Sequence, residues 1–188
     1  MPRVVAGKAK GTILIAPKGR HSRPTADKTK EAIFSSIDPY LYDAKFLDLF
    51  AGTGQMGIEA LSRAASEAVF VDNSRPAIQA IRANLKKTHL EDQARVLQSS
   101  ANSAVKKLLA AEEVFDIIYF DPPYADFANL LEQINESSLA KLLNDDGILI
   151  IEEDSQDFKE ENAVELTMFT LLRRGKYGQA MVSFYEKI

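Results

Sequence analysis

The sequence of 188 residues contains no cysteine and only two histidines, His21 and His89. The absence of cysteine excludes a disulfide framework, a thiolate nucleophile and a zinc site built on thiolates. The two histidines are isolated from each other, so we expect no metal site. No apolar run approaches the length of a membrane span, and the N-terminus lacks the apolar core of a signal peptide. These absences predict a cytoplasmic protein without a membrane partner.

Acidic residues are scarce in the first thirty positions, where Asp27 stands alone against eight lysines and arginines. This segment has a net charge of +7, which leaves −11 on the remainder of the chain. A basic segment on an acidic body favours contact with a polyanion. The candidate RNA-binding residues are Lys8, Lys10, Lys18, Arg20 and Arg23. The alternative is a set of solvated side chains that deter pairing at a sheet edge.

The length and the ordinary apolar and charged fractions indicate one compact domain with a small appendage. Residues 3–6 and 12–15 flank a glycine-bounded turn and predict a β-hairpin, which a basic, breaker-rich linker follows. We therefore expect a basic arm and linker at residues 1–24 and the main domain at residues 25–188. The oligomeric state is left open, with a monomer as the expectation.

Apolar runs alternate with helical patterns through most of the main domain. Strands are expected at 46–50, 67–72, 94–98, 115–120 and 147–151, and helices at about 25–37, 58–61, 76–87, 101–111, 127–134 and 139–143. This alternation predicts an α/β fold with a doubly wound, mostly parallel sheet. Two further strand-like runs, 164–172 and 180–185, surround a glycine-bearing connection at 173–178 and predict a C-terminal antiparallel hairpin.

A glycine turn follows the first strand of the main domain, with Gly52, Gly54 and Gly57 in Gly-x-Gly-x-x-Gly spacing. Glycines allow a tight turn and the close approach of a ligand, and the helix that follows offers backbone amides. The next strand ends at Asp72, about 20 residues on, where a carboxylate can accept both hydroxyls of a ribose. Together these features predict a nucleoside-binding crevice.

The spacing of the glycines suits NAD as well as other adenosine cofactors, so the spacing alone does not identify the ligand. Asp48, four residues before Gly52, argues against a dinucleotide. A pyrophosphate would gain nothing from another negative charge at that point. A cationic sulfonium cofactor that carries a free ammonium group would be stabilised by the same carboxylate.

Asp121-Pro122-Pro123-Tyr124 directly follows the buried-strand pattern at 115–120. The prolines lack amide donors and cannot continue a strand ladder, so the segment predicts a stiff loop at the carboxyl end of the strand. The loop presents a carboxylate, a backbone carbonyl and an aromatic ring. These groups suit a flat ligand with an amino group, because the oxygens accept its N–H bonds and the ring stacks on its face. The alternative is a structural turn with a surface tyrosine.

These segments resemble motifs of known methyltransferases. Residues 47–54 are similar to the first motif of class I S-adenosylmethionine-dependent methyltransferases. Residues 121–124 resemble the fourth motif of members that methylate exocyclic or amide nitrogens. The whole chain resembles the bacterial RsmD-type 16S ribosomal RNA guanine-N2-methyltransferases, and the segments that narrow the resemblance to this family are 3–7, 23–25, 31–34, 177–178 and 183–185.

The resemblance implies a seven-stranded Rossmann-like sheet, S-adenosylmethionine as cofactor, and ribosomal RNA or the assembling small ribosomal subunit as partner. The residues that it implies at the cofactor are Asp48, Gly52, Thr53, Gly54, Asp72, Asn73, Ser100 and Ala101. Those implied at the target guanine are Asp121, Pro122, Pro123 and Tyr124, and Arg23 and Thr25 line the site without an assigned role. Many members carry an acid that faces the adenine after the third strand. This chain has Ser99-Ser100-Ala101 there, so adenine recognition is left open.

Methylation of guanine N2 in 16S RNA is the function that we expect, and three other functions stay open. A DNA amino-methyltransferase usually needs a target-recognition domain, for which this chain has no room. A protein glutamine methyltransferase usually carries Asn at the position of Asp121. A non-catalytic RNA-binding module is disfavoured by the intact glycines, Asp72 and Asp121.

Overall fold

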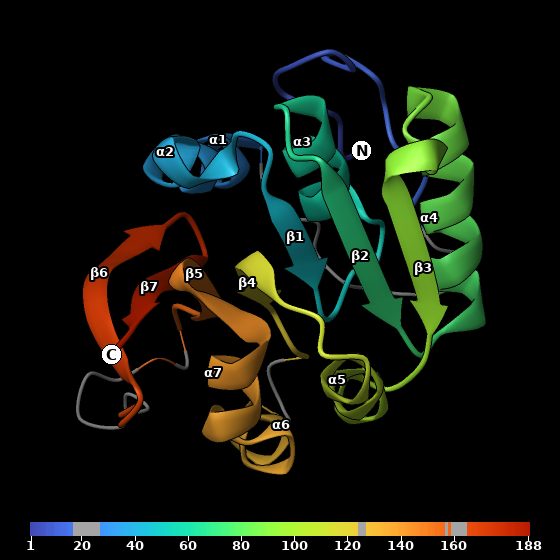
Figure 1. Cartoon of the computed structure of the whole chain (residues 1–188). Coiled ribbons are helices and arrows are strands. Elements are labelled where there is room, and N and C mark those ends of the chain that lie inside the picture. Colours follow the sequence, from blue (N-terminus) through green and yellow to red (C-terminus); the bar gives the residue numbers. More distant parts are fainter. Residues whose placement is uncertain (17–26, 124–126, 157, 159–164) are drawn as a thin grey trace.

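Seven strands form one mixed sheet in the computed structural model, which describes residues 1–16, 27–123, 127–156, 158 and 165–188 (Figure 1). The strands are β1 (Lys45–Asp48), β2 (Glu67–Asp72), β3 (Ala94–Gln98), β4 (Phe115–Phe120), β5 (Leu143–Asp154), β6 (Phe169–Tyr177) and β7 (Ala180–Lys187). Their order is β3-β2-β1-β4-β5-β7-β6. β1 to β5 pair in parallel, whereas β7 runs antiparallel to β5 and to β6. The predicted α/β fold with an antiparallel end is confirmed.

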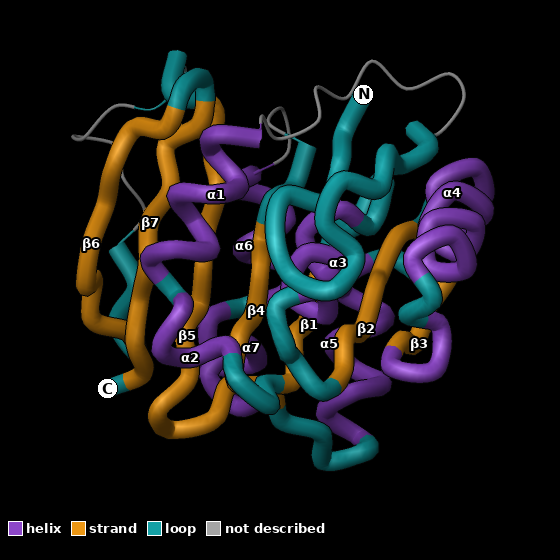
Figure 2. The backbone as a smooth tube through the Cα atoms, turned by 90° about the horizontal axis from the view of Figure 1, so that it is seen from above, coloured by secondary structure: helices purple, strands orange, loops and turns teal. Residues whose placement is uncertain are grey.

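Helices cover both faces of the sheet (Figures 1 and 2). One face carries α1 (Asp27–Ser36), α2 (Asp38–Leu41), α3 (Gln55–Ser62) and α4 (Arg75–Thr88), and the other carries α5 (Ala101–Ala110), α6 (Phe127–Ile134) and α7 (Glu136–Leu142). A 3-10 turn, η1 (Glu91–Gln93), joins α4 to β3. Over the residues described, none of these helices combines the length and the apolar character needed to cross a bilayer.

Two hydrophobic cores lie between the sheet and its helices, because successive strand residues point to opposite faces. Phe46 and Phe70 pack in the core beneath α1, α3 and α4, where the rings of Phe46 and Phe34 stack at 6.3 Å. Leu47 and Val69 are the sequence neighbours of those two strand residues, and they pack in the core beneath α5, α6 and α7. Burial on both faces explains why the central strands read as unbroken apolar runs in the sequence.

The C-terminal hairpin differs in its bounds from the sequence prediction. The first strand of the hairpin was expected at 164–172, and the connection at 173–178. The structure extends β6 through Arg173, Arg174 and Lys176 to Tyr177, and only Gly178 and Gln179 connect it to β7. β6 is an edge strand whose side chains are mostly exposed, so charged residues fit within it. Gly178 has a φ of +64°, which favours glycine in so short a turn.

Of the β-hairpin expected at residues 3–6 and 12–15, the structure has one antiparallel bridge, between Arg3 and Ile13, and no strand in that segment. The N-terminal segment packs on α3, because the backbone amides of Val5 and Ala6 donate to the Glu59 carboxylate at 2.8 and 2.9 Å. Gly7 has a φ of +80°, and a Cβ there would lie 1.8 Å from the carbonyl oxygen of Ser62. This close approach explains the glycine of the turn. The division into an arm at 1–24 and a main domain at 25–188 stays a prediction.

Lys30 corrects the charge argument for the basic segment. Its side chain is buried, and its Nζ donates to the Arg3 carbonyl and lies 3.6 Å from Glu59 Oε2. Burial lowers the pKa of Lys30, while the charge of Glu59 opposes that shift. Lys30 therefore anchors the N-terminal segment to α1 and α3, and its charge is not available to a polyanion.

Candidate functional site

Four acidic side chains meet at the edge of the sheet where the parallel strands end. Asp48 ends β1, Asp72 ends β2, Asp121 follows β4 and Glu152 lies near the end of β5. Asp48 pairs in register with Phe70 and Tyr119, while Phe120 pairs with Ile151, immediately before Glu152. Carboxyl ends of parallel strands are where ligands bind in open α/β sheets. The predicted crevice therefore has an acidic edge.

The glycine turn between β1 and α3 has the conformation that its sequence predicts. Gly52 and Gly54 have φ values of +54° and +76°, in the region that side chains disfavour. A Cβ on Gly57 would lie 2.4 Å from the ring of Phe70, so the third glycine allows α3 to pack on β2. Two glycines thus shape the turn, and the third brings the helix close to the sheet.

Asp48 is 1% exposed, and its Oδ2 atom has no hydrogen-bond partner among the residues that the structure describes. Burial raises the pKa of Asp48 to about 7, although hydrogen bonds from the backbone of Phe50 and Gly57 act in the opposite direction. An unpaired carboxylate oxygen is costly to bury. A cationic donor in the crevice would satisfy it, so the site fits a ligand with an ammonium group.

Asp72 is buried beside the glycine turn and holds two loop backbones in place. Its Oδ2 accepts from the amide of Gly52 at 3.0 Å, and its Oδ1 accepts from the amide of Ser74 at 2.8 Å. The structure therefore brings the predicted ribose acid and the predicted glycine turn together. The two backbone amides therefore fix the orientation of the Asp72 carboxylate.

The other residues expected at the cofactor surround the same edge. The hydroxyl of Thr53 accepts from the amide of Gln55 at 3.3 Å, and Asn73 is exposed just beyond Asp72. Ser100 caps α5, because its Oγ accepts from the amide of Ser103 at 3.3 Å, and Ala101 is buried in the first turn of that helix. The Ser100 hydroxyl thus has a structural role as the cap of α5.

Asp121 begins the loop that the two prolines stiffen. The residue is half-buried, Pro122 is buried and Pro123 is exposed. The pKa of Asp121 is raised well above its usual range, first by burial and then by the negative charges of Glu152 and Asp48. Tyr124 lies outside the described residues, so its predicted stacking role stays a prediction.

Glu152 is a site residue that the sequence reasoning missed. It is 3% exposed and accepts a hydrogen bond from the hydroxyl of Tyr119, which is equally buried. Burial raises the pKa of Glu152, and the bond from Tyr119 partly offsets that shift. The signal was an acid directly after the buried run 148–151, as Asp48, Asp72 and Asp121 follow theirs.

The candidate RNA-binding residues are only partly described. Lys8 and Lys10 are exposed, and Lys8 Nζ donates to Gln93 Oε1 at 2.5 Å. Lys18, Arg20 and Arg23, together with Thr25, lie outside the described residues. Their contact with RNA stays a prediction.

A family model described as "Conserved hypothetical protein 95" matches residues 2–186 of the chain. The chain is 39% identical over 187 residues to "Putative rRNA methyltransferase YlbH" of Bacillus subtilis, which is 98% of each chain. It is 33% identical over 156 residues to "Ribosomal RNA small subunit methyltransferase D" of Escherichia coli K12, which is 82% of this chain and 76% of the other.

The fold is also similar to that of solved structures. One described as "Putative methyltransferase yhhF from Escherichia coli" has a TM-score of 0.80 at 30% identity, over 98% of this chain and 97% of that one. A second, the "putative methylase HI0767 from Haemophilus influenzae", has a TM-score of 0.75 at 25% identity, over 100% and 98% of the two chains. The similarity covers nearly the whole chain, so the overall fold is shared with structures that are described as putative methyltransferases.

Proposed function

Because the chain belongs to the family described as Conserved hypothetical protein 95, we propose that it is an S-adenosylmethionine-dependent methyltransferase of small-subunit ribosomal RNA. The names of the relatives in Bacillus subtilis and Escherichia coli support the reaction and the class of RNA. The proposed acceptor is the exocyclic N2 amine of a guanine in 16S RNA. The observation that carries this proposal is the meeting of two carboxylates with different surroundings, Asp48 beside the glycine turn and Asp121 on the proline loop.

The residues of the crevice fit S-adenosylmethionine by their chemistry. Asp48 would hold the ammonium of the methionyl group, since its buried Oδ2 has no partner among the described residues. Asp72 would bind the ribose hydroxyls, and the turn at Gly52 and Gly54 would admit the cofactor close to the backbone. The bound cofactor supplies an electrophilic methyl group.

Asp121 would orient the target amine. The N2 lone pair of guanine is delocalised into the ring, so N2 is a poor nucleophile until the amine is turned out of that conjugation. The Asp121 carboxylate and the Pro122 carbonyl would accept the two N2 hydrogens and favour the reactive orientation. The adjacent N1–H of guanine also suits a carboxylate acceptor. The negative charge of Asp121 then stabilises the positive charge that develops on nitrogen.

The raised pKa of Asp121 has a use in this reaction. A carboxylate that binds protons more tightly than usual is a better acceptor for the proton that the methylated amine must lose. The ionised form is nevertheless required at the start, because a protonated carboxyl group accepts hydrogen bonds poorly and carries no charge. The amine donors and the developing positive charge both favour ionisation of Asp121. Positioning rather than strong base catalysis carries most of the effect.

The proposal is tested by incubating the protein with radiolabelled S-adenosylmethionine and four separate acceptors. These are 16S ribosomal RNA, assembling small subunits, plasmid DNA and total cellular protein. We expect label in one of the two ribosomal acceptors and N2-methylguanosine after nuclease digestion. Label in DNA or in glutamine residues would overturn the proposed substrate. If none of the four acceptors receives label, a non-catalytic RNA-binding protein is favoured.

A further inference from the structure

Helix α4 contains several basic residues and no acidic residue. Its fourteen residues include Arg75, Arg82, Lys86 and Lys87, all exposed, and no Asp or Glu, on a chain whose net charge is −4. The opposite side of the helix packs against the sheet through Ile78, Ile81 and Leu85, among others. α4 therefore presents a one-sided basic face to the solvent.

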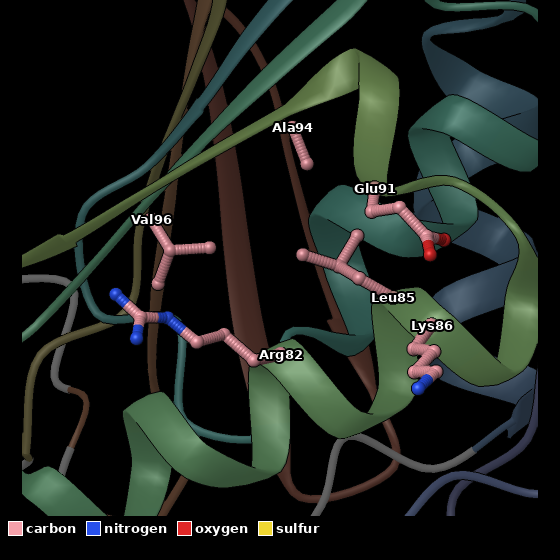
Figure 3. A pocket seen from close by; sticks show the side chains of 6 residues that line it. All are labelled: Arg82, Leu85, Lys86, Glu91, Ala94 and Val96. Carbon is pink, nitrogen blue, oxygen red and sulfur yellow. The ribbon is translucent and has the colours of Figure 1, made fainter.

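A recess of about 370 Å³ adjoins this face, between α4, η1 and β3. It is lined by Arg82, Leu85, Lys86, Glu91, Ala94 and Val96. Leu85, Ala94 and Val96 form an apolar floor, and Arg82 extends along the side beneath Val96 (Figure 3). The recess thus combines an apolar floor, two cations and one carboxylate.

The N-terminal segment continues the basic face. Lys87 Nζ donates to the Ile13 carbonyl at 2.7 Å, and Lys8 Nζ donates to Gln93 Oε1 at the end of η1. The segment, α4 and η1 therefore lie side by side, as Figure 1 also shows. Lys8 therefore extends the charge of α4 to η1, which borders the recess.

α4 also links this face to the acidic edge of the sheet. The helix begins at Arg75, three residues after Asp72, and runs back along the sheet towards Lys86. At 1.5 Å per residue, Arg75 and Lys86 are about 16 Å apart along the helix axis. The sheet order also places β1 and β2 between β4 and β3, so several nucleotides of the RNA would separate a target base beside Asp121 from the recess.

We propose that the recess between α4 and β3 binds one nucleotide of the RNA substrate outside the methyl-transfer site. Arg82 and Lys86, whose charged groups point to opposite sides in Figure 3, pair with the phosphates on the two sides of this nucleotide. The base lies on the floor of Leu85, Ala94 and Val96, and Glu91 accepts an N–H from the edge of the base. A planar guanidinium can also stack on a base, which suits Arg82 for both contacts. This inference rests on the proposed function, because it assumes an RNA substrate.

The experiment compares RNA binding by three variants at several salt concentrations, with a 16S RNA transcript and with isolated small subunits. The first is Arg82→Ala with Lys86→Ala. The second is Ala94→Leu, which fills the recess without changing charge, and Val96→Met serves the same purpose if thermal melts show that Ala94→Leu does not fold. The matched control is Lys106→Ala with Lys107→Ala, which removes two exposed lysines from α5 on the opposite face.

We expect the log–log salt slope of the first variant to be shallower by about 1.4 to 1.8 units, since each phosphate contact contributes roughly 0.7 to 0.9. The control should keep the wild-type slope. The filled recess should weaken binding at least about fivefold at an unchanged slope, because the base contact is lost and the phosphate contacts are not. The affinity for S-adenosylmethionine should be that of wild type in all of them.

Three results would overturn the inference. These are an unchanged slope in the first variant, an equal change in the control pair, and unchanged affinity in the folded recess-filling variants. A first variant that binds the transcript normally but not the subunit would instead mean that the recess takes an acidic segment of a ribosomal protein. A failure of the proposed function is distinguishable, because wild-type protein would then transfer no methyl group to either RNA.

Discussion

Tyr119 donates a hydrogen bond to the carboxylate of Glu152, and both side chains are buried at the ends of adjacent strands. Asp121 follows two residues after Tyr119, and its pKa is raised first by burial and then by the charge of Glu152. Glu152, held in place by Tyr119, therefore helps to set the pKa of the carboxylate that we propose to act on the target amine. Burial and Glu152 also hold the pKa of the Tyr119 hydroxyl well above its usual range, so Tyr119 stays a hydrogen-bond donor.

Glu152→Gln should move the acid limb of the pH–activity profile to lower pH. The reason is that a neutral amide no longer raises the pKa of Asp121, so Asp121 ionises at lower pH. The Gln Oε1 atom can still accept from Tyr119, which preserves the packing. The measurement is kcat/KM for methyl transfer to RNA between about pH 5 and 9.

Glu153→Gln is the matched control, since Glu153 is the next residue and points to the other face of β5. Its removal should leave the acid limb where it is. An acid limb in Glu152→Gln that stays in place or moves to higher pH would contradict the support that we assign to Glu152.

Asp48→Asn should stabilise the free protein and weaken cofactor binding at the same time. The folded pKa of Asp48, about 7, lies above its ordinary value of 3.8, so the folded state binds this proton more tightly than the unfolded state. The contribution of Asp48 to stability is therefore present below about pH 4 and is lost as pH rises to about 7. An asparagine at this position does not ionise, so the variant keeps its stability as pH rises. The difference should grow with pH towards an upper bound of roughly 4 kcal/mol.

Urea unfolding of both proteins at pH 5 and pH 8 measures this difference, and calorimetric titration measures the affinity for S-adenosylmethionine. We expect a larger gain in unfolding free energy at pH 8 than at pH 5, and an affinity lower by roughly tenfold or more, because a charged acceptor is lost. Equal stability at the two pH values would mean that Asp48 is not a buried titrating group. Unchanged affinity would remove it from the ammonium site.

Much of the acidic edge could be predicted from the sequence because it depends on local rules. An apolar run that ends in an acid or in Pro-Pro marks the end of a buried strand, which located Asp48, Asp72 and Asp121. The glycine spacing likewise predicted a turn that the positive φ values of Gly52 and Gly54 confirm. These features need only neighbouring residues for their recognition.

Features that depend on distant partners could not be predicted. Lys30 looked like one more surface cation, and only the packing of α1 against α3 and the N-terminal segment shows that it is buried against Glu59. Glu152 gained its role from its position beside Tyr119 across the β4–β5 register. The error in β6 has a similar cause, because an exposed edge strand tolerates the charged residues that usually indicate a loop.

Asp121→Ala should bind S-adenosylmethionine nearly as well as wild type and lose most of its turnover, since its role begins with the target base. Tyr124→Ala should lose base stacking, by about 1–3 kcal/mol in RNA affinity. Tyr124→Phe should retain most activity, because only the ring face is required. Methyl-transfer assays with calorimetry of cofactor binding test all three. A Tyr124→Phe variant as damaged as Tyr124→Ala would mean that the hydroxyl takes part.

The basic N-terminal segment should bind phosphates of the RNA backbone without taking part in methyl transfer. Replacing Lys8, Lys10, Lys18 and Arg20 with alanine should make the salt slope of RNA binding shallower by between about one and four units, depending on how many contact phosphates. Cofactor affinity should not change, because none of these residues belongs to the proposed cofactor site. Lys30 is left unchanged, since its burial against Glu59 means that its loss would disturb the fold instead.

Combining the two sets of substitutions tests whether the N-terminal segment and α4 contact separate phosphates. If the N-terminal segment and α4 contact the same RNA at different phosphates, the slope changes of the quadruple variant and of Arg82→Ala with Lys86→Ala should add. Thermal melts confirm that each variant is folded before its slope is compared. An unchanged slope in the quadruple variant would identify its four charges as a solvated edge, and the salt dependence would then come from other cations, those of α4 among them.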